Sequence, residues 1–127
     1  MTSADRPRRR PGYVYDHGTD PDPRFSLANE RTFLAWTRTG LALLAGAAAL
    51  DALDLPLPDT LQAVLAALLA VAGVVVAGTS CWTWARVERA MREGAPLPGN
   101  PAMVVVIVVV AVTGLALAAS SLVRAFS

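Results

Sequence analysis

The sequence predicts an all-α membrane protein with three transmembrane helices, its N-terminus in the cytoplasm and its C-terminus outside. Three observations support this fold class. Of the 127 residues, 54% are hydrophobic and only 17% are charged, a balance that is unusual in a small soluble domain. The apolar residues gather in three long stretches. Ten of the eleven arginines lie in residues 6–38 or 86–92, so charge is distributed unevenly along the chain.

Each apolar stretch is long enough to cross a bilayer. A hydrocarbon core about 30 Å thick needs about 20 residues of helix, and the stretches 34–53, 60–85 and 102–123 reach that length. The β-branched run 104–112 would suit a buried strand in a soluble protein, but lipid accepts only helices and closed barrels, and barrel strands alternate polar with apolar residues. The sequence therefore predicts a three-helix transmembrane domain over 26–127, with helices at about 26–53, 59–93 and 101–124.

The arginines predict the orientation, because short loops rich in basic residues stay in the cytoplasm. The segment between the second and third spans is basic, whereas the loop between the first two spans has no basic residue. That loop carries Asp51, Asp54 and Asp59. All three tryptophans lie beside the arginine-rich ends, as an aromatic belt at one membrane interface would. We therefore expect a multi-pass protein of the cell (inner or plasma) membrane, with the lipid bilayer as its first partner.

Residues 1–25 are rich in proline, glycine and arginine and show no apolar period, so we expect a disordered cytoplasmic tail. The cluster Arg8 to Arg10 either touches anionic lipid headgroups or serves only as a topology signal. So short a cluster, without a folded reader beside it, does not predict nucleic-acid binding.

Several function classes are disfavoured by residue counts. Cys81 is the one cysteine and His17 the one histidine, so a single chain offers neither a disulfide nor a histidine–cysteine zinc site. No two groups with matched catalytic roles lie close together, and the three loop aspartates are better explained as solvated carboxylates than as an acid-base or cation site. We expect no enzyme activity, no cofactor and no metal.

The segment 27–39 combines polar, aromatic and charged residues at the edge of a span, which crossing a bilayer does not require. Arg31 and Arg38 are seven residues apart and share a helix face. Arg38, about one turn inside the span, either snorkels to the headgroups or faces a bundle interior and holds an anion or carboxylate. Glu30 and Glu88 are its candidate protein partners.

Two further patterns concern the second helix. Glu88 with Arg92 and Arg89 with Glu93 have the spacing of solvated i,i+4 ion pairs. Small residues also recur every three or four positions, which lets helix backbones approach closely, so we expect copies of the chain to associate through this helix; the alternative is a contact within one chain. We expect these packing positions to include Ala66, Ala70, Gly73 and Ala77.

The motif at the first span resembles a known family. The string Asn29-Glu30-Arg31-Thr32-Phe33-Leu34-Ala35-Trp36, followed by Arg38, Thr39 and three spans, is similar to the bacterial YidH-like membrane proteins of the DUF202 family and to the transmembrane module of the vacuolar transporter chaperone (VTC) complex. The resemblance covers residues 24–123. It implies three-helix modules that assemble side by side, with Arg31 and Arg86 facing an anion path for polyphosphate. The chain lacks the polymerase and phosphate-sensor domains of that complex, so synthesis of polyphosphate is not implied.

Two hypotheses for function follow. The first is an oligomeric module that binds or conducts phosphate or polyphosphate-like anions, with Arg31, Arg38 and Arg86 at its cytoplasmic mouth. The second is a structural or assembly subunit that docks another membrane protein through its motif. The motif and packing residues in this hypothesis are Asn29, Glu30, Thr32, Trp36 and Thr39.

Overall fold

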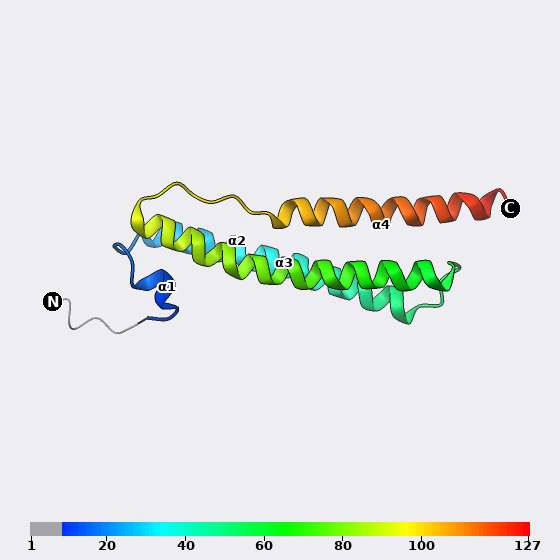
Figure 1. Ribbon diagram of the computed structural model, residues 1–127, viewed down its shortest axis with the longest axis horizontal. Coiled ribbons are helices and arrows are strands. Elements are labelled where there is room, and N and C mark those ends of the chain that lie inside the picture. The colour runs from blue at the N-terminus through cyan, green and yellow to red at the C-terminus, as the bar shows by residue number, and fades with distance from the viewer. Residues whose placement is uncertain (1–8) are drawn as a thin grey trace.

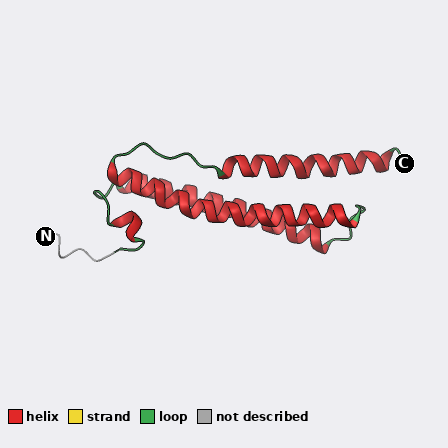
Figure 2. Cartoon of the chain, viewed as in Figure 1, coloured by secondary structure: helices red, strands yellow, loops and turns green. Residues whose placement is uncertain are grey.

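Four helices form the part of the chain that the computed structural model describes, residues 9–127 (Figure 1). They are α1 (Gly12–Tyr15), α2 (Pro23–Ala52), α3 (Asp59–Glu93) and α4 (Ala102–Ala125). Figure 2 shows helices and loops throughout these residues and no strand. The predicted all-α fold class is confirmed.

Helices α2 and α3 form an antiparallel hairpin, which we call the hairpin together with its loop, residues 53–58 (Figure 1). Two prolines in the loop, Pro56 and Pro58, prevent the helix from continuing, and α3 begins directly after Pro58. Gln62 closes this end, because its side-chain amide donates to the backbone oxygens of Leu50 and Leu53 (2.5 and 2.8 Å). These carbonyls at the end of α2 would otherwise lack partners in a membrane.

The hairpin packs through small residues at its centre. A Cβ added at Gly73 would lie 2.9 Å from the Gly40 carbonyl oxygen and 2.8 Å from Leu44 Cγ, so the two backbones are already in contact there. Leu43, Leu69 and Val76 are buried around this contact. In lipid the hydrophobic effect does not drive helices together, so close backbone packing of this kind is what stabilises the pair.

Helix α4 lies beside α3 and runs antiparallel to it (Figure 1). The linker, residues 94–101, leads from the end of α3 to the start of α4. Gly94 ends α3 in a left-handed conformation (φ 65°) that glycine adopts without strain. Asn100 then caps α4, since its side-chain oxygen accepts from the Ala102 N–H at 2.9 Å. Only Ala102, Val109 and Thr113 of α4 are buried.

Three of these helices are long and apolar enough to cross a membrane, as predicted. In the most apolar 18-residue window of each helix, the mean hydropathy is 1.4 for α2, 2.4 for α3 and 2.9 for α4. At 1.5 Å per residue the 35 residues of α3 are about 52 Å long, so α3 extends beyond a core of about 30 Å or tilts within it. Large apolar side chains remain exposed along all three helices, which is the surface that a bilayer covers. The orientation of the termini stays a prediction.

The structure differs from the expectation at the N-terminal end. Helix α2 begins at Pro23, three residues before the predicted start, because Asp22 caps it by accepting from the Arg24 N–H (2.9 Å) and proline suits the first helical position. Residues 9–22, expected within a disordered tail, include α1 and pack against α3. We call residues 9–22 the strap. The rest of that predicted tail, residues 1–8, lies outside the described residues.

Candidate functional site

Where α2 begins and α3 ends, the interface between the two helices is polar. We call the side chains of Ser26, Asn29 and Glu88 at this interface the polar seam. Its centre is Glu88, a carboxylate with only 5% of its surface exposed. Ser26 Oγ donates to Glu88 Oε1 at 2.7 Å, and the Asn29 side-chain amide donates to Glu88 Oε2 at 3.3 Å. Both donors are uncharged and both come from α2. The seam therefore joins the two helices through a buried carboxylate with no cationic partner among the hydrogen bonds and ion pairs of residues 9–127.

Asn29 is the most buried residue of the sequence motif, and its amide makes a second contact, to the backbone oxygen of Trp84 at 3.1 Å. One side chain thus bridges two consecutive turns of α3. The position needs a short side chain with two N–H groups, which explains why asparagine begins the motif. The predicted packing role of Asn29 has a physical basis in these two hydrogen bonds.

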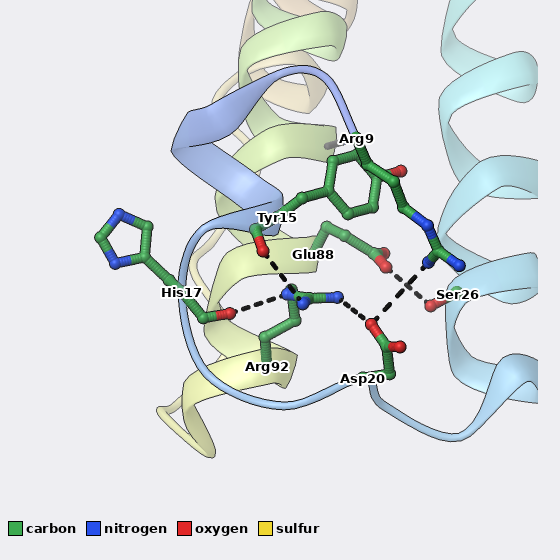
Figure 3. Close-up of polar contacts among 7 residues, drawn as sticks. All are labelled: Arg9, Tyr15, His17, Asp20, Ser26, Glu88 and Arg92. Carbon is green, nitrogen blue, oxygen red and sulfur yellow. Dashed lines mark hydrogen bonds and ion pairs between the residues drawn. The ribbon is translucent and has the colours of Figure 1, made fainter. Parts of the chain in front are cut away.

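Arg92 fastens the strap to the hairpin (Figure 3). Only 8% of the residue is exposed. Its guanidinium donates to the His17 backbone oxygen (2.8 Å), to the Tyr15 backbone oxygen (3.2 Å) and to the Asp20 carboxylate (2.6 Å). Arg9 lies 3.8 Å from the same carboxylate. The planar fork of arginine donors suits several acceptors at once, so one side chain holds three positions of the strap.

The strap also follows the backbone at the end of α3. Thr19 N–H donates to the Arg92 carbonyl oxygen at 3.1 Å. Gly18 is required beside it, because its φ of 60° is left-handed and an added Cβ would lie 2.1 Å from that oxygen. Tyr13 stacks on Trp82 with ring centroids 5.6 Å apart, and Arg89 lies over the Tyr13 ring at 4.6 Å.

One expectation for this end of α3 is wrong. The spacing of Glu88 and Arg92 suggested an exposed i,i+4 pair, but both residues are buried and each bonds to a different segment, Glu88 to α2 and Arg92 to the strap. Arg89 and Glu93 do form the expected pair at 3.0 Å. The sequence spacing is the same for both pairs. Helix phase decides the outcome, since Glu88 and Arg92 are buried beneath α2 and the strap, whereas Arg89 and Glu93 lie at the rim of the strap, where Arg89 contacts Tyr13 and Glu93 lies 3.6 Å from His17.

The three arginines singled out from the sequence, Arg31, Arg38 and Arg86, are all exposed. Within residues 9–127 none of them has a hydrogen bond or an ion pair through its side chain. Arg31 follows Asn29 by two residues, which is 200° around a helix, so it lies on the face of α2 opposite α3. Arg38 and Arg24 share that face at seven-residue spacing, because α2 already begins at Pro23.

Arg86 lies on the corresponding outer face of α3, two residues before Glu88. Since Asn29 contacts both Trp84 and Glu88, Arg31 and Arg86 are at nearly the same depth along the hairpin. The structure therefore places Arg31 and Arg86 at one level but on opposite outer faces, with Arg38 two turns further along α2, and it does not bring the three together within one chain.

The remaining motif residues lie along α2 between the polar seam and the centre of the hairpin. Glu30 is exposed, and Trp36 is half-buried against the apolar core. The hydroxyls of Thr32 and Thr39 donate to backbone oxygens one turn earlier in α2, Ala28 (3.1 Å) and Ala35 (3.2 Å). These bonds satisfy the hydroxyls without a ligand.

The predicted packing positions on α3 serve contacts within the chain. Gly73 touches Gly40 and Leu44 of α2, and Ala77 lies beside Gly40. Ala66 is buried in the same interface and Ala70 is half-buried beside it. For these residues the structure shows the alternative contact, within a single hairpin, and self-association through α3 stays a prediction.

A cavity of about 300 Å³ lies under the strap and above the polar seam. It carries charges of both signs on several elements. Its charged lining residues are Arg9, Asp20, Glu30, Glu88 and Arg92, and Tyr15 and Trp84 add aromatic surface. No pattern singled out in the sequence predicts this cavity, although the residues of α2 and α3 that line it recur every three or four positions. Within residues 9–127, no three side chains of His, Cys, Asp or Glu converge as metal ligands would.

Comparison with known proteins also sets the hairpin apart from the rest of the molecule. Residues 24–90, which include nearly all of the hairpin, match the family described as Domain of unknown function (DUF202). The chain is 47% identical over 109 residues to an uncharacterized protein of Mycobacterium tuberculosis, covering 80% of this chain and 88% of that protein. It is 42% identical over 109 residues to the inner membrane protein YidH of Escherichia coli, covering 79% of this chain and 92% of YidH. No solved structure gives a significant match.

Proposed function

This chain belongs to the DUF202 family of YidH-like inner membrane proteins, and from that premise we propose that it is an oligomeric module that binds or conducts anions at an arginine-lined cytoplasmic mouth. The anions have phosphate or polyphosphate-like chemistry. The proposal assigns the protein no catalytic role, and it places the N-terminus in the cytoplasm, where the arginine-rich ends of α2 and α3 would lie.

One observation carries the proposal: Arg31, Arg38 and Arg86 are exposed, Arg31 and Arg86 lie near one end of the hairpin, and none of the three has a side-chain partner within residues 9–127. Arginines close to a bilayer are costly when unpaired, by up to about 2.5–3.5 kcal/mol at a span centre. The guanidinium of Arg92, by contrast, has hydrogen-bond acceptors within the chain. The three exposed arginines are therefore free for a ligand or a partner from outside the chain.

The positions of the arginines favour a ring of copies. Arg31 lies on the outer face of α2 and Arg86 on the outer face of α3, at nearly the same depth. A head-to-tail ring joins one outer face to the other and brings Arg31 of one copy beside Arg86 of the next. Exposed small residues on the outer face of α2 support close helix packing there. They are spaced by seven: Ala28, Ala35, Ala42 and Ala49.

Resemblance to the transmembrane module of the VTC complex points to the same anion chemistry. Guanidinium groups keep their charge at all physiological pH values and bind phosphate oxygens in pairs. A ring of them would hold a phosphate-like anion without any enzyme chemistry.

Purified protein in liposomes tests the proposal through phosphate or polyphosphate binding and flux. Arg31→Gln or Arg86→Gln should reduce binding at least about tenfold, since each removes charge-assisted hydrogen bonds. Lysine at either position should retain part of the binding. Arg10→Gln is the control and should have little effect, because Arg10 lies in the strap. Full binding by both glutamine variants would reject the anion proposal and favour the assembly subunit, which would then copurify with another membrane protein.

A further inference from the structure

Two neighbouring hollows follow one seam of the hairpin. The upper one is the cavity under the strap, of about 300 Å³. The lower one is a groove of about 360 Å³, mainly apolar, lined by Glu30, Phe33, Leu34, Cys81 and Trp84. Glu30 and Trp84 line both hollows, so they adjoin.

The two hollows are stacked along the direction in which the helices cross the membrane. On α3 their lining residues recur at three- and four-residue spacing, as Cys81, Trp84, Glu88 and Arg92. The lining is charged where the helices end and becomes apolar toward the middle of the spans. A phospholipid has the same order, a charged headgroup followed by an acyl chain.

The charges of the upper cavity favour a cationic group in the ligand. Asp20 already contacts both Arg92 and Arg9. Glu88, however, accepts only from the neutral donors Ser26 and Asn29, although it is almost fully buried. A buried carboxylate is strongly destabilised unless a cation or further donors compensate it. Glu30 adds a second carboxylate at the junction with the groove. A primary ammonium with three N–H donors could serve both.

Trp84 lies at the same junction and carries an unpaired donor. Its indole Nε1 is buried and has no hydrogen-bond partner within residues 9–127. Buried N–H groups nearly always have an acceptor, and an orphaned one calls for an explanation. In a phospholipid the phosphate and ester oxygens come directly after the ammonium, which is where Trp84 lies relative to Glu88 along α3.

We propose that the cavity and the groove together bind one phospholipid with a primary amine headgroup, of the phosphatidylethanolamine type. Its ammonium lies between Glu88 and Glu30, and a phosphate or ester oxygen accepts from Trp84. One acyl chain follows the groove past Phe33, Leu34 and Cys81. The strap covers the headgroup (Figure 3), and the bilayer around the hairpin supplies the lipid. This site uses the carboxylates of the seam and is independent of Arg31, Arg38 and Arg86.

Native mass spectrometry of the full chain, with lipids of matched acyl chains, tests the proposal. Phosphatidylethanolamine should be retained about tenfold more strongly than phosphatidylcholine, whose methylated nitrogen has no N–H, and than anionic phosphatidylglycerol. Glu88→Gln and Glu30→Gln should each reduce that preference several-fold. Glu93→Gln is the matched control at the same end of α3, because Glu93 does not line either hollow. Equal retention of the three lipids, or a preference for phosphatidylglycerol, would overturn the assignment.

A second set of measurements distinguishes a bound lipid from a bound soluble amine. Cys81→Trp fills the groove and should reduce retention of phosphatidylethanolamine while thermal unfolding stays normal, since Cys81 is exposed. Phosphoethanolamine without acyl chains should fail to displace the lipid. Displacement at equal concentration would reject the lipid in favour of a soluble amine. If Glu88→Gln does not fold, Glu30→Gln carries the headgroup test alone, because Glu30 is exposed and makes no bond that the fold depends on.

Discussion

The hairpin and α4 are both membrane-spanning, yet they are held in different ways. Helices α2 and α3 touch along their whole lengths, through Gly40 and Gly73 at the centre and through a polar seam at one end. Helix α4 is the most apolar span, with a mean hydropathy of 2.9 over its most apolar 18 residues, but buries only three residues. The family match covers 24–90 and ends before α4 begins. Specific packing thus belongs to the hairpin, whereas α4 depends mostly on lipid.

The difference in packing between the hairpin and α4 predicts that a substitution at Gly73 has the largest effect on stability. Gly73→Leu should destabilise the protein by about 3 kcal/mol, because its side chain would meet the Gly40 backbone and Leu44. Thermal unfolding in mild detergent measures the change. Gly78→Leu on the same helix, and Gly114→Leu on α4, are controls whose added side chains meet nothing within 4 Å of Cβ. A normal unfolding temperature with a smaller oligomer would instead place Gly73 between chains.

The polar seam should give the next largest effect. Asn29→Ala removes the donors to Glu88 and to the Trp84 carbonyl and should cost about 2 kcal/mol, since both acceptors are left buried. Chemical or thermal unfolding followed by tryptophan fluorescence measures it. Thr32→Ala, whose hydroxyl bonds only within α2, is the control and should stay within about 0.5 kcal/mol of wild type. Equal effects of the two substitutions would show that the seam does not stabilise the hairpin.

A smaller effect is expected where the strap joins the hairpin. Arg92→Gln should open the strap while α2 and α3 stay packed, because Arg92 bonds to Tyr15, His17 and Asp20 rather than to α2. Chymotrypsin should then cut at Tyr13 or Tyr15 about tenfold faster, as expected from the loss of charge-assisted hydrogen bonds worth about 1.5 kcal/mol. Arg86→Gln should leave the cleavage rate unchanged. Unaltered cleavage of the Arg92→Gln protein would contradict the assignment of Arg92 as the strap's anchor.

The smallest effect is expected on α4. Thr113 Oγ1 is buried with no partner within residues 9–127. Thr113→Val replaces the hydroxyl by a methyl of similar shape, so the protein should be as stable as wild type or more stable by at most about 1 kcal/mol. Thermal unfolding again provides the measurement. A loss of 2 kcal/mol or more would mean that Thr113 makes a specific polar contact within the span and would remove the distinction between α4 and the hairpin.

The sequence was sufficient to predict the spans. Length and hydropathy identify a transmembrane helix without reference to any partner, so the three helices and the fold class followed directly. Helix caps also leave a local signal in the sequence: Asn100 precedes Pro101 where α4 begins, and Asp22 precedes Pro23 where α2 begins.

Contacts between segments far apart in the sequence could not be predicted. Arg92 donates to two backbone oxygens and one carboxylate of the strap. Every residue has a backbone oxygen, so a sequence does not indicate which of them accepts from a distant side chain. Glu88 has the spacing of an exposed pair with Arg92, but its environment depends on which face of α3 meets α2. For the same reason the seven-residue spacing of Arg31 and Arg38 predicted a shared face and not its direction, which is away from α3.

The attachment of the strap also sets an order of events during synthesis. Arg92 lies 75 residues after His17, one of the residues that it holds. At about 5–20 residues per second, a ribosome needs roughly 4 to 15 seconds to make that stretch. Helix α2 and most of α3 are therefore made before the strap has anything to dock on. The first described residues of the chain are among the last to reach their final place, and the cavity above Glu88 stays open until they do.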